Sequence, residues 1–193
     1  IASASSTYGS AVSPGAVSFT NVVSGDEVTA SASLVSTSLS TGGQIKAGSY
    51  RQQVSAIGGT DSGNYSLSPY TTATATYTVN QLALTGTAIA AASSTYGSAV
   101  SPGAVNFTNV LDGDQVTASA SLVGTSLSGA SKVKAGSYAQ QVSAIGGADA
   151  GNYSLIAYTT PSLNYQVSQL ALTGTAIASS SSTYGAELSP GAV

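Results

Sequence analysis

The chain has 193 residues, of which 6% are charged, and its formal net charge is −3. It contains no Cys and no His, which excludes a disulfide framework, a Cys/His zinc site and a Ser-His-Asp triad. Its acidic balance offers no basic patch for nucleic acid, and no apolar run approaches the ~20 residues that span a bilayer. Apolar residues still make up 42% of the chain, so each folding unit can bury a core.

The chain is organised as an 88-residue repeat. Tyr8, Tyr96 and Tyr184 lie 88 residues apart, and the other tyrosines of the first copy recur at the same interval in the second. Repetition at a fixed interval determines the architecture before any motif is considered. We therefore expect a first unit with a truncated first strand, a complete second unit and an incomplete third, at 1–81, 82–169 and 170–193. Because the chain does not begin with Met and ends inside a repeat, we expect it to be a segment of a longer polypeptide.

Alternation of apolar and polar residues predicts six or seven short strands in each unit. In chain order their apolar positions are Val17/Phe19, Val28 to Leu34, Tyr50 to Ala56, Tyr65/Leu67, Ala73 to Val79, and Leu82/Leu84 at the start of the next unit. Clusters of Gly, Asn, Asp and Pro separate them and supply the positive φ that tight turns need. The abundance of Ser, Thr, Val and Ala, with few helix-favouring charged residues, also predicts an all-β fold.

The strand over 73–79 has the clearest pattern, because it can be compared with its copy over 161–167. One alternating set is apolar in both copies, and the interleaved set stays polar although its residues change. A period of two that survives such drift predicts a strand with one buried face. The apolar set is Ala73, Ala75, Tyr77 and Val79 in the first copy, and Pro161, Leu163, Tyr165 and Val167 in the second.

Short strands with turns every 8–12 residues predict an immunoglobulin-like β-sandwich in each unit. A β-solenoid is the alternative, but its coils repeat every 20–30 residues or so, and no such period is found inside the unit. Between Val79, where the last strand of the first unit should end, and Leu82, only Asn80 and Gln81 remain. Because this connection is no flexible Gly/Ser-rich linker, we expect tandem sandwiches that form a stiff rod.

Several segments of the unit together resemble a known family. They are Thr7-Tyr8-Gly9, Val23-Ser24-Gly25-Asp26-Glu27-Val28, Gly59-Thr60-Asp61-Ser62-Gly63-Asn64-Tyr65-Ser66-Leu67 and the Thr/Ala strand ending at Val79. The whole 88-residue unit resembles the MBG/YDG-type repeats, which occur in tandem in large secreted bacterial adhesins of the filamentous-haemagglutinin kind and in biofilm matrix proteins. It departs from them in having Tyr8-Gly9-Ser10 where a Tyr-Asp-Gly triplet is expected. The resemblance implies a stalk or fibre segment and carries no catalytic residues.

Four aspartates keep their register in the two units, as the pairs Asp26/Asp114 and Asp61/Asp149. Asp at a turn commonly accepts hydrogen bonds from backbone N–H groups, and we expect that role here. The same four residues are the candidate ligands of a calcium ion. Hard cations prefer six to eight oxygens, however, and two carboxylates per unit supply few of them. We therefore expect neither a metal nor another cofactor.

A Lys–Asn isopeptide crosslink, as in some surface fibres, needs a buried Lys, an Asn and a carboxylate. The candidate residues are Lys46 with Asn21 or Asn64, and Lys134 with Asn109 or Asn152. Because Lys is rarely buried, a solvated surface charge is the simpler interpretation of both lysines.

The tyrosines next to turns and on apolar faces have two interpretations. Tyr65, Tyr77, Tyr153 and Tyr165 lie on predicted buried faces, which favours core packing beside the turn asparagines Asn64 and Asn152. A tyrosine beside such a turn is typical of the residue that fixes the corner of a sandwich. Exposed tyrosines would instead stack on sugars and make each unit a glycan-binding module.

These patterns favour a mechanical function. We expect a structural stalk or fibre segment of an extracellular bacterial adhesin or biofilm matrix protein. Its partners would be neighbouring repeats and, through other regions, polysaccharide or a host cell surface. No residue set supports acid–base or nucleophilic catalysis, so we do not expect an enzyme. Two alternatives stay open: a glycan-binding repeat module, and a filament subunit whose incomplete third repeat lends its strand to a neighbouring chain.

Overall fold

The computed structural model describes residues 1–174 and 176–187, which form an all-β structure with two short 3-10 turns, so the predicted class is confirmed. The strands of the first repeat are β1 (Ala4–Thr7), β2 (Ser33–Val35), β3 (Gly48–Val54), β4 (Tyr70–Thr71) and β5 (Tyr77–Asn80). Those of the second repeat are β6 (Leu82–Ala83), β7 (Ala88–Ile89), β8 (Ala92–Thr95), β9 (Val105–Asn106), β10 (Thr117–Ala118), β11 (Ser121–Val123), β12 (Gly136–Val142), β13 (Ile145–Gly146), β14 (Tyr153–Ser154), β15 (Tyr158–Thr159) and β16 (Tyr165–Ser168). The turns η1 (Ser62–Asn64) and η2 (Ala150–Asn152) occupy equivalent positions in the two repeats.

Each repeat is built around one mixed sheet with the same strand order. In the first repeat the order is β1-β5-β3-β2 with β4 beside β3, and in the second it is β8-β16-β12-β11 with β15 beside β12. Strand β5 runs parallel to β1 and antiparallel to β3, where Tyr77 lies opposite Tyr50. The equivalent pair in the second repeat is Tyr165 opposite Tyr138. The two copies of the sequence therefore form the same sheet in the same register.

The predicted alternation holds within β5 and fails before it. Tyr77 and Val79 are buried while Thr78 and Asn80 are exposed, and β16 repeats the pattern. The expectation that Ala73 and Ala75 share this buried face is wrong, because both are exposed. The hydroxyl of Thr72 accepts a hydrogen bond from the backbone N–H of Gln52 and donates one to the carbonyl of Thr74. These bonds bend the chain, so the strand begins at Tyr77. In the second copy Pro161 and Leu163 are likewise exposed.

A buried glutamine, which the alternation pattern does not predict, ties β3 to the first residues of the repeat. The side chain of Gln52 is fully buried; its Nε2 donates to the carbonyl of Ala2 at 2.9 Å, and its Oε1 accepts from the N–H of Gly15 at 2.6 Å. Gln140 makes the same two bonds in the second repeat, to Ala90 and Gly103. Because buried polar groups are costly without partners, these bonds fix the edge of the sheet in both repeats.

Some predicted strands form only where a partner strand is present. Residues 153–154 form β14 in the second repeat, where they pair in parallel with β6. The equivalent residues of the first repeat, Tyr65 and Ser66, have no strand assignment. The same contrast applies to Val17, since its counterpart Val105 lies in β9 and pairs with β7. Strands are stabilised by pairing, so the same sequence takes different local structure at different places in the chain.

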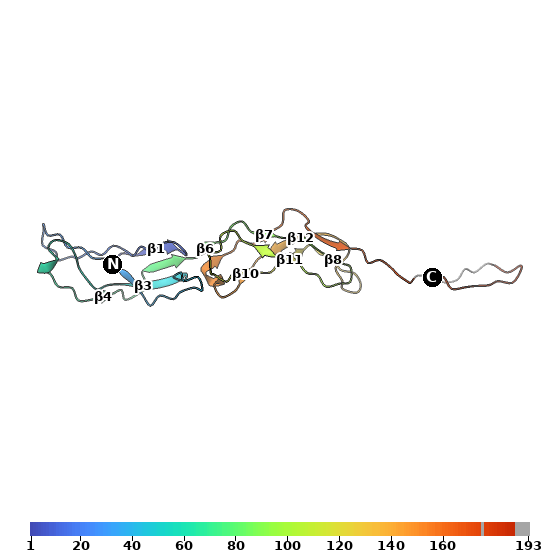
Figure 1. Ribbon diagram of the computed structural model, residues 1–193, viewed down its shortest axis with the longest axis horizontal. Helices are drawn as coiled ribbons and strands as arrows, with labels where there is room; N and C mark the ends of the chain where they lie inside the picture. The colour runs from blue at the N-terminus through green and yellow to red at the C-terminus, as the bar shows by residue number, and fades with distance from the viewer. Residues whose placement is uncertain (175, 188–193) are drawn as a thin grey trace.

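The molecule is long and narrow (Figure 1). The two repeats lie end to end, and β5 of the first continues into β6 of the second with Gln81 alone between them. Beyond β16, residues 170–187 leave the second repeat and extend away from it, apart from the undescribed residue 175. No helix in the described part of the chain is long and apolar enough to cross a membrane.

Candidate functional site

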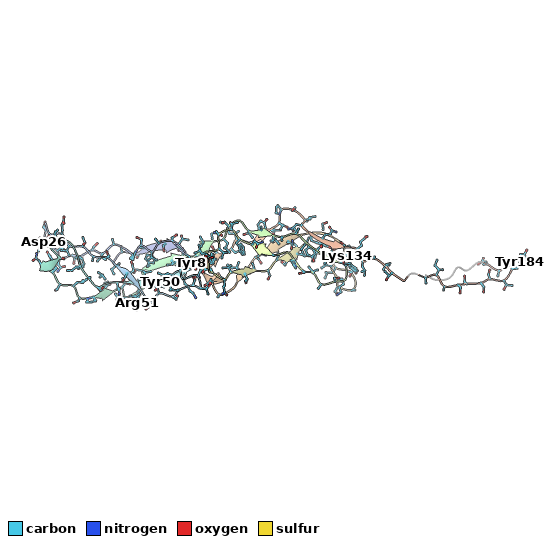
Figure 2. The ribbon with its side chains drawn as sticks, viewed as in Figure 1. Tyr8, Asp26, Tyr50, Arg51, Lys134 and Tyr184 are labelled. Carbon is cyan, nitrogen blue, oxygen red and sulfur yellow. The ribbon has the colours of Figure 1, made fainter. Side chains whose placement is uncertain are left out.

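The most elaborate arrangement of side chains lies where the two repeats meet, and we call it the junction. Tyr8, at the end of β1, lies at this boundary in Figure 2. From the first repeat the junction receives Tyr8, Thr41, Gly42, Ala47 and Gln81, and from the second it receives Leu111, Gly113, Asp114, Asp149, Gly151, Asn152 and Tyr153. The second-repeat residues come from the turn before β10 and from η2 with its flanks, which the repeat folds onto one end.

Asp114 is the centre of the junction. Its Oδ2 accepts hydrogen bonds from the hydroxyls of Tyr8, at 2.5 Å, and Tyr153, at 2.6 Å. Its Oδ1 accepts a third, of 3.1 Å, from the backbone N–H of Gly42. The rings of Tyr8 and Tyr153 meet edge to face, with centroids 5.4 Å apart and an interplanar angle of 73°. Hydrogen bonds to a carboxylate are stronger than neutral ones, and such an aromatic pair adds about 0.5–1.5 kcal/mol beyond its burial. The carboxylate therefore binds the repeats to each other.

A second carboxylate, that of Asp149, makes a parallel connection. It accepts a bond of 2.9 Å from the N–H of Gln115 in its own repeat and one of 3.2 Å from the N–H of Thr41 in the other. The hydroxyl of Thr41 also contacts this carboxylate. Nearby, the side chain of Asn152 accepts from the N–H of Ala47 at 3.0 Å. The turn containing η2 thus receives donors from two residues of the connection between β2 and β3 of the first repeat.

The electrostatics of the junction favour charged aspartates and neutral tyrosines. Burial alone would raise the pKa of Asp114, but hydrogen bonds from Tyr153, Tyr8, Ser40 and Gly42 hold it below its usual value. The N–H of Gln115, followed by Thr41, lowers the pKa of Asp149. Burial, and then the bond to Asp114, raises the pKa of Tyr8 to about 12. Burial, again with the bond to Asp114, raises the pKa of Tyr153. Both bonds to Asp114 are therefore fully formed near neutral pH.

An apolar contact completes the junction beneath the polar one. Leu84, just after β6, is 8% exposed and packs in the same cluster as Tyr8 and Tyr153. Its N–H donates to the carbonyl of Ser154 at 2.8 Å, and the side chain of Asn109 bonds the backbone on either side of it. The strand that leaves the first repeat is therefore an integral part of the second.

The burial of these residues depends on the neighbouring repeat. Tyr153 is 2% exposed and Asp149 is 1% exposed, whereas their counterparts Tyr65 and Asp61, at the free end of the first repeat, are partly exposed. Tyr8 is 1% exposed, and its counterpart Tyr96 at the other free end is also partly exposed. Equal sequences thus differ in burial according to whether a repeat lies against them.

The aspartates considered as calcium ligands are engaged in hydrogen bonds. Asp114 and Asp149 form the junction, Asp26 accepts from the hydroxyl of Tyr65 at 2.7 Å, and Asp61 accepts from the N–H of Glu27 at 2.8 Å. Within residues 1–174 and 176–187 there is no group of three or more His, Cys, Asp or Glu placed to hold a metal. The carboxylates act on turns and on the neighbouring repeat.

The candidate crosslink residues differ in burial and in hydrogen bonding. Asn109 and Asn152 use their amides on backbone groups, at Thr85 and Ala83 and at Ala47 respectively. Asn21 and Asn64 are exposed, Lys134 is exposed and Lys46 is partly buried. Of the predicted core tyrosines, Tyr77, Tyr153 and Tyr165 are buried, and Tyr65 is partly exposed.

Thr41 and Gly42 are the junction residues that the sequence does not reveal. Their counterparts are Gly129 and Ala130, so comparison of the copies marks the loop as variable. A Cβ on Gly42 would lie 2.6 Å from both the carbonyl oxygen of Asp112 and the Oδ1 of Asp114, which explains the glycine. The tyrosines and aspartates of the junction occur at the same positions in both repeats, and this recurrence marks them as candidate site residues. It does not show that they meet across the boundary between repeats.

Comparison of the chain with protein-family models, with curated proteins and with solved structures found no match in any of the three.

Proposed function

We propose that the chain is a rod segment of an extracellular adhesin or matrix fibre, in which each unit is an immunoglobulin-like sandwich related to the MBG/YDG-type repeats. The observation that carries this proposal is the junction. A protein whose repeats only needed to be present in many copies could join them by flexible linkers. This chain instead uses two carboxylates, buried tyrosines and a buried leucine to hold two repeats end to end.

Two connections at different positions make the junction resist bending. The β5–β6 chain crosses the boundary as extended backbone, and the Asp114 and Asp149 bonds lie beside it. Bending in any direction would break charge-assisted bonds or expose Leu84. The function of such a segment is mechanical, because it sets the distance between whatever lies at its two ends.

The surface suits a long fibre outside the cell. Exposed strand positions carry Ser, Thr, Asn and Gln, as at Thr78, Asn80, Gln166 and Ser168, and few charges are present. Such neutral, hydrated strand positions do not promote side-by-side association, which large apolar patches favour. Function as a spacer requires nothing more of the surface.

Stiffness can be measured directly, because the chain has no Cys and labels can be placed at will. We would attach spin labels at Thr78→Cys and Gln166→Cys, both on exposed strand positions, and measure the distance distribution by double electron–electron resonance. A narrow distribution that broadens in Tyr8→Phe/Thr41→Ala would support the rod. A broad distribution in the unmodified junction would contradict it.

The cellular part of the proposal needs a second measurement. Gold-labelled antibody against the repeat, applied to producing cells, should decorate thin fibres that leave the cell surface in electron micrographs. Antibody pre-absorbed with the purified chain is the control. Gold spread through secreted polysaccharide without fibres would favour a glycan-binding module instead, and gold confined to the cell interior would contradict both.

A further inference from the structure

The turn that the second repeat places against the first contains the dipeptide Asp112-Gly113. It is the only place in the sequence where a glycine follows an aspartate or an asparagine. A dipeptide of this kind can rearrange without an enzyme, because the nitrogen of a residue that has no side chain is open to attack on the carboxyl carbon before it. The junction therefore contains a site of spontaneous backbone chemistry.

The turn is open to solvent, and the bond that closes it leaves the reacting nitrogen free. The N–H of Asp114 donates to the carbonyl of Leu111 at 3.2 Å, so the closing bond does not engage the N–H of Gly113. Gly113 has φ 82°, the left-handed conformation that glycine supplies at the third position of a tight turn. Asp112 and Gly113 are both exposed, so water reaches the site.

The backbone of the same turn lies directly against the first repeat. The carbonyl oxygen of Asp112 and the Oδ1 of Asp114 each lie 2.6 Å from the position that a Cβ on Gly42 would take. The carbonyl of Gly113 accepts a bond of 2.8 Å from the hydroxyl of Thr41. These contacts are made by consecutive residues, so they depend on the normal length of the backbone that connects them.

The first repeat has the same turn without the reactive carboxyl group. Ser24-Gly25 stands there in place of the reactive pair, and Gly25 also has a positive φ, of 102°. The N–H of Asp26 closes this turn by donating to the carbonyl of Val23 at 3.0 Å. A serine side chain has no carbonyl carbon for the next nitrogen to attack. The turn therefore forms without an aspartate at this position, and only the copy at the junction can react in this way.

We propose that Asp112 is a modification site, at which conversion of aspartate to isoaspartate loosens the junction as the protein ages. The nitrogen of Gly113 forms a bond to the Cγ of Asp112, and the carboxyl oxygen leaves as water with the proton of that nitrogen. A water molecule then opens the resulting five-membered succinimide by breaking the bond from the nitrogen to one of its two carbonyl carbons. Where the bond to the main-chain carbon breaks, the chain continues through Cβ and Cγ, and the total mass is that of the original chain.

Isoaspartate would disrupt the junction in two ways. The main chain gains one methylene group, which displaces the carbonyl of Gly113 and the carboxylate of Asp114 from the first repeat. The former main-chain carbonyl of Asp112 becomes a carboxylate beside that of Asp114, and like charges at short distance repel each other. We therefore expect the bonds from Thr41 and Gly42 to be lost while the sheet of each repeat stays intact.

The closed junction should protect the turn from this reaction. Ring closure requires rotation of the backbone at residue 112, which the contact with Gly42 opposes, so the reaction proceeds when the junction opens locally. Overpacking in Gly42→Ala should populate the open junction and raise the rate roughly tenfold or more. The inference deepens the proposed function, and rests on it in treating the junction as the element that keeps the rod straight.

Ageing of the purified chain tests the proposal. We would incubate the full chain near neutral pH below its unfolding temperature, digest samples over time, and identify isoaspartate at residue 112 by electron-transfer fragmentation. Isoaspartate should accumulate in the unmodified chain, and faster in Asp112→Asn, because ammonia is lost from an amide more readily than water from a carboxylate. A sample kept unfolded in urea gives the rate without protection. Asp112→Ser, which copies the first repeat and keeps the backbone carbonyl, is the control that cannot react.

The spin-label pair Thr78→Cys and Gln166→Cys then reports the effect on the junction. Its distance distribution should broaden as isoaspartate accumulates and stay narrow when Asp112→Ser is aged in the same way. Conversion in urea without conversion in the folded chain would overturn the modification site. Equal rates in Gly42→Ala and the unmodified chain would overturn the dependence on opening.

Two further results would overturn the loosening itself. One is isoaspartate at residue 112 with an unchanged distance distribution, and the other is equal broadening in aged Asp112→Ser. The proposed function is decided separately, by the distance distribution of freshly prepared chain, which contains aspartate at residue 112. A narrow distribution in fresh chain that stays narrow with age would therefore support the rod and contradict only the ageing of its junction.

Discussion

The hydroxyl of Tyr8 and the carboxylate of Asp114 are 106 positions apart in the chain and 2.5 Å apart in the structure. The bond connects two repeats that each have their own sheet, and it does so beside a strand that passes from one to the other. In tandem arrays stability is approximately the sum of the stability of each repeat and an interaction between neighbours. Tyr8 and Asp114 supply part of the interaction between neighbouring repeats. Substitutions at these residues should therefore uncouple the repeats without unfolding them.

Tyr8→Phe removes the hydroxyl and keeps the ring that packs against Tyr153. Asp114 loses one of its donors, and hydrogen bonds to charged groups contribute about 1.5–3 kcal/mol. We expect the free energy of unfolding of the second repeat, measured by urea denaturation, to fall by about 1–2 kcal/mol. Tyr96→Phe is the matched control, since Tyr96 occupies the same position in the second repeat and is partly exposed. Equal losses in the two variants would show that the effect arises within a repeat.

Acidification should weaken the junction. The pKa values of Asp114 and Asp149 are lowered in the folded protein, so the unfolded chain binds protons more readily than the folded one. The stabilisation from these carboxylates is complete above the ordinary aspartate pKa of about 3.9 and is lost as the pH falls through their lower folded values. We expect the free energy of unfolding to decrease from about pH 5 to about pH 2.

The double variant Asp114→Asn/Asp149→Asn tests the origin of that decrease. It should be less stable than the parent at pH 7, because an amide is a weaker acceptor than a carboxylate. Its stability should also change less with pH over the acid range. An unchanged acid dependence in this variant would assign the effect to other carboxylates.

The sequence predicts the class of the fold well, because the evidence for it is local and repeated. Alternation places Tyr77 and Val79 inside, and the 88-residue interval divides the chain into equivalent units. It overextends the same strand to Ala73, because the bend depends on Thr72 bonding to β3, 20 residues earlier. It also gives no sign that Gln52 is buried, since a polar residue on an apolar face has to be explained by partners that are distant in the chain.

The junction is harder to predict for the same reason. The sequence shows that Asp114, Asp149 and Tyr153 keep their positions, and turn chemistry explains the aspartates within one repeat. Their second role needs Thr41 and Gly42, which are not repeated, and a docking geometry that no local pattern encodes. Comparison of the two copies identifies residues that stabilise each repeat. It does not identify residues that form contacts between one particular pair of neighbouring repeats.

Gly42→Ala should distinguish residues needed within one repeat from residues needed for contact between two repeats. The added Cβ would lie 2.6 Å from Asp112 and Asp114, so the loop has to move away from the second repeat. Overpacking of this kind costs about 1–3 kcal/mol. The counterpart Ala130 shows that the loop itself accepts alanine, so the sheet of the first repeat should keep its stability. We expect a broader spin-label distance distribution with an unchanged unfolding transition for the first repeat. A lower stability of the first repeat would show instead that Gly42 is needed by its own loop.

The strand that crosses the boundary should be the most sensitive part of the second repeat. Leu84 is buried against residues from several strands, and truncation of a buried leucine to alanine costs about 2–5 kcal/mol through lost burial and the cavity left behind. Leu84→Ala should therefore lower the urea midpoint of the second repeat strongly. Leu172→Ala makes the same chemical change in an identical local sequence where the side chain is 85% exposed, and it should leave the midpoint unchanged. If both variants lost the same stability, the difference between the buried and exposed copies of this strand would have no energetic consequence.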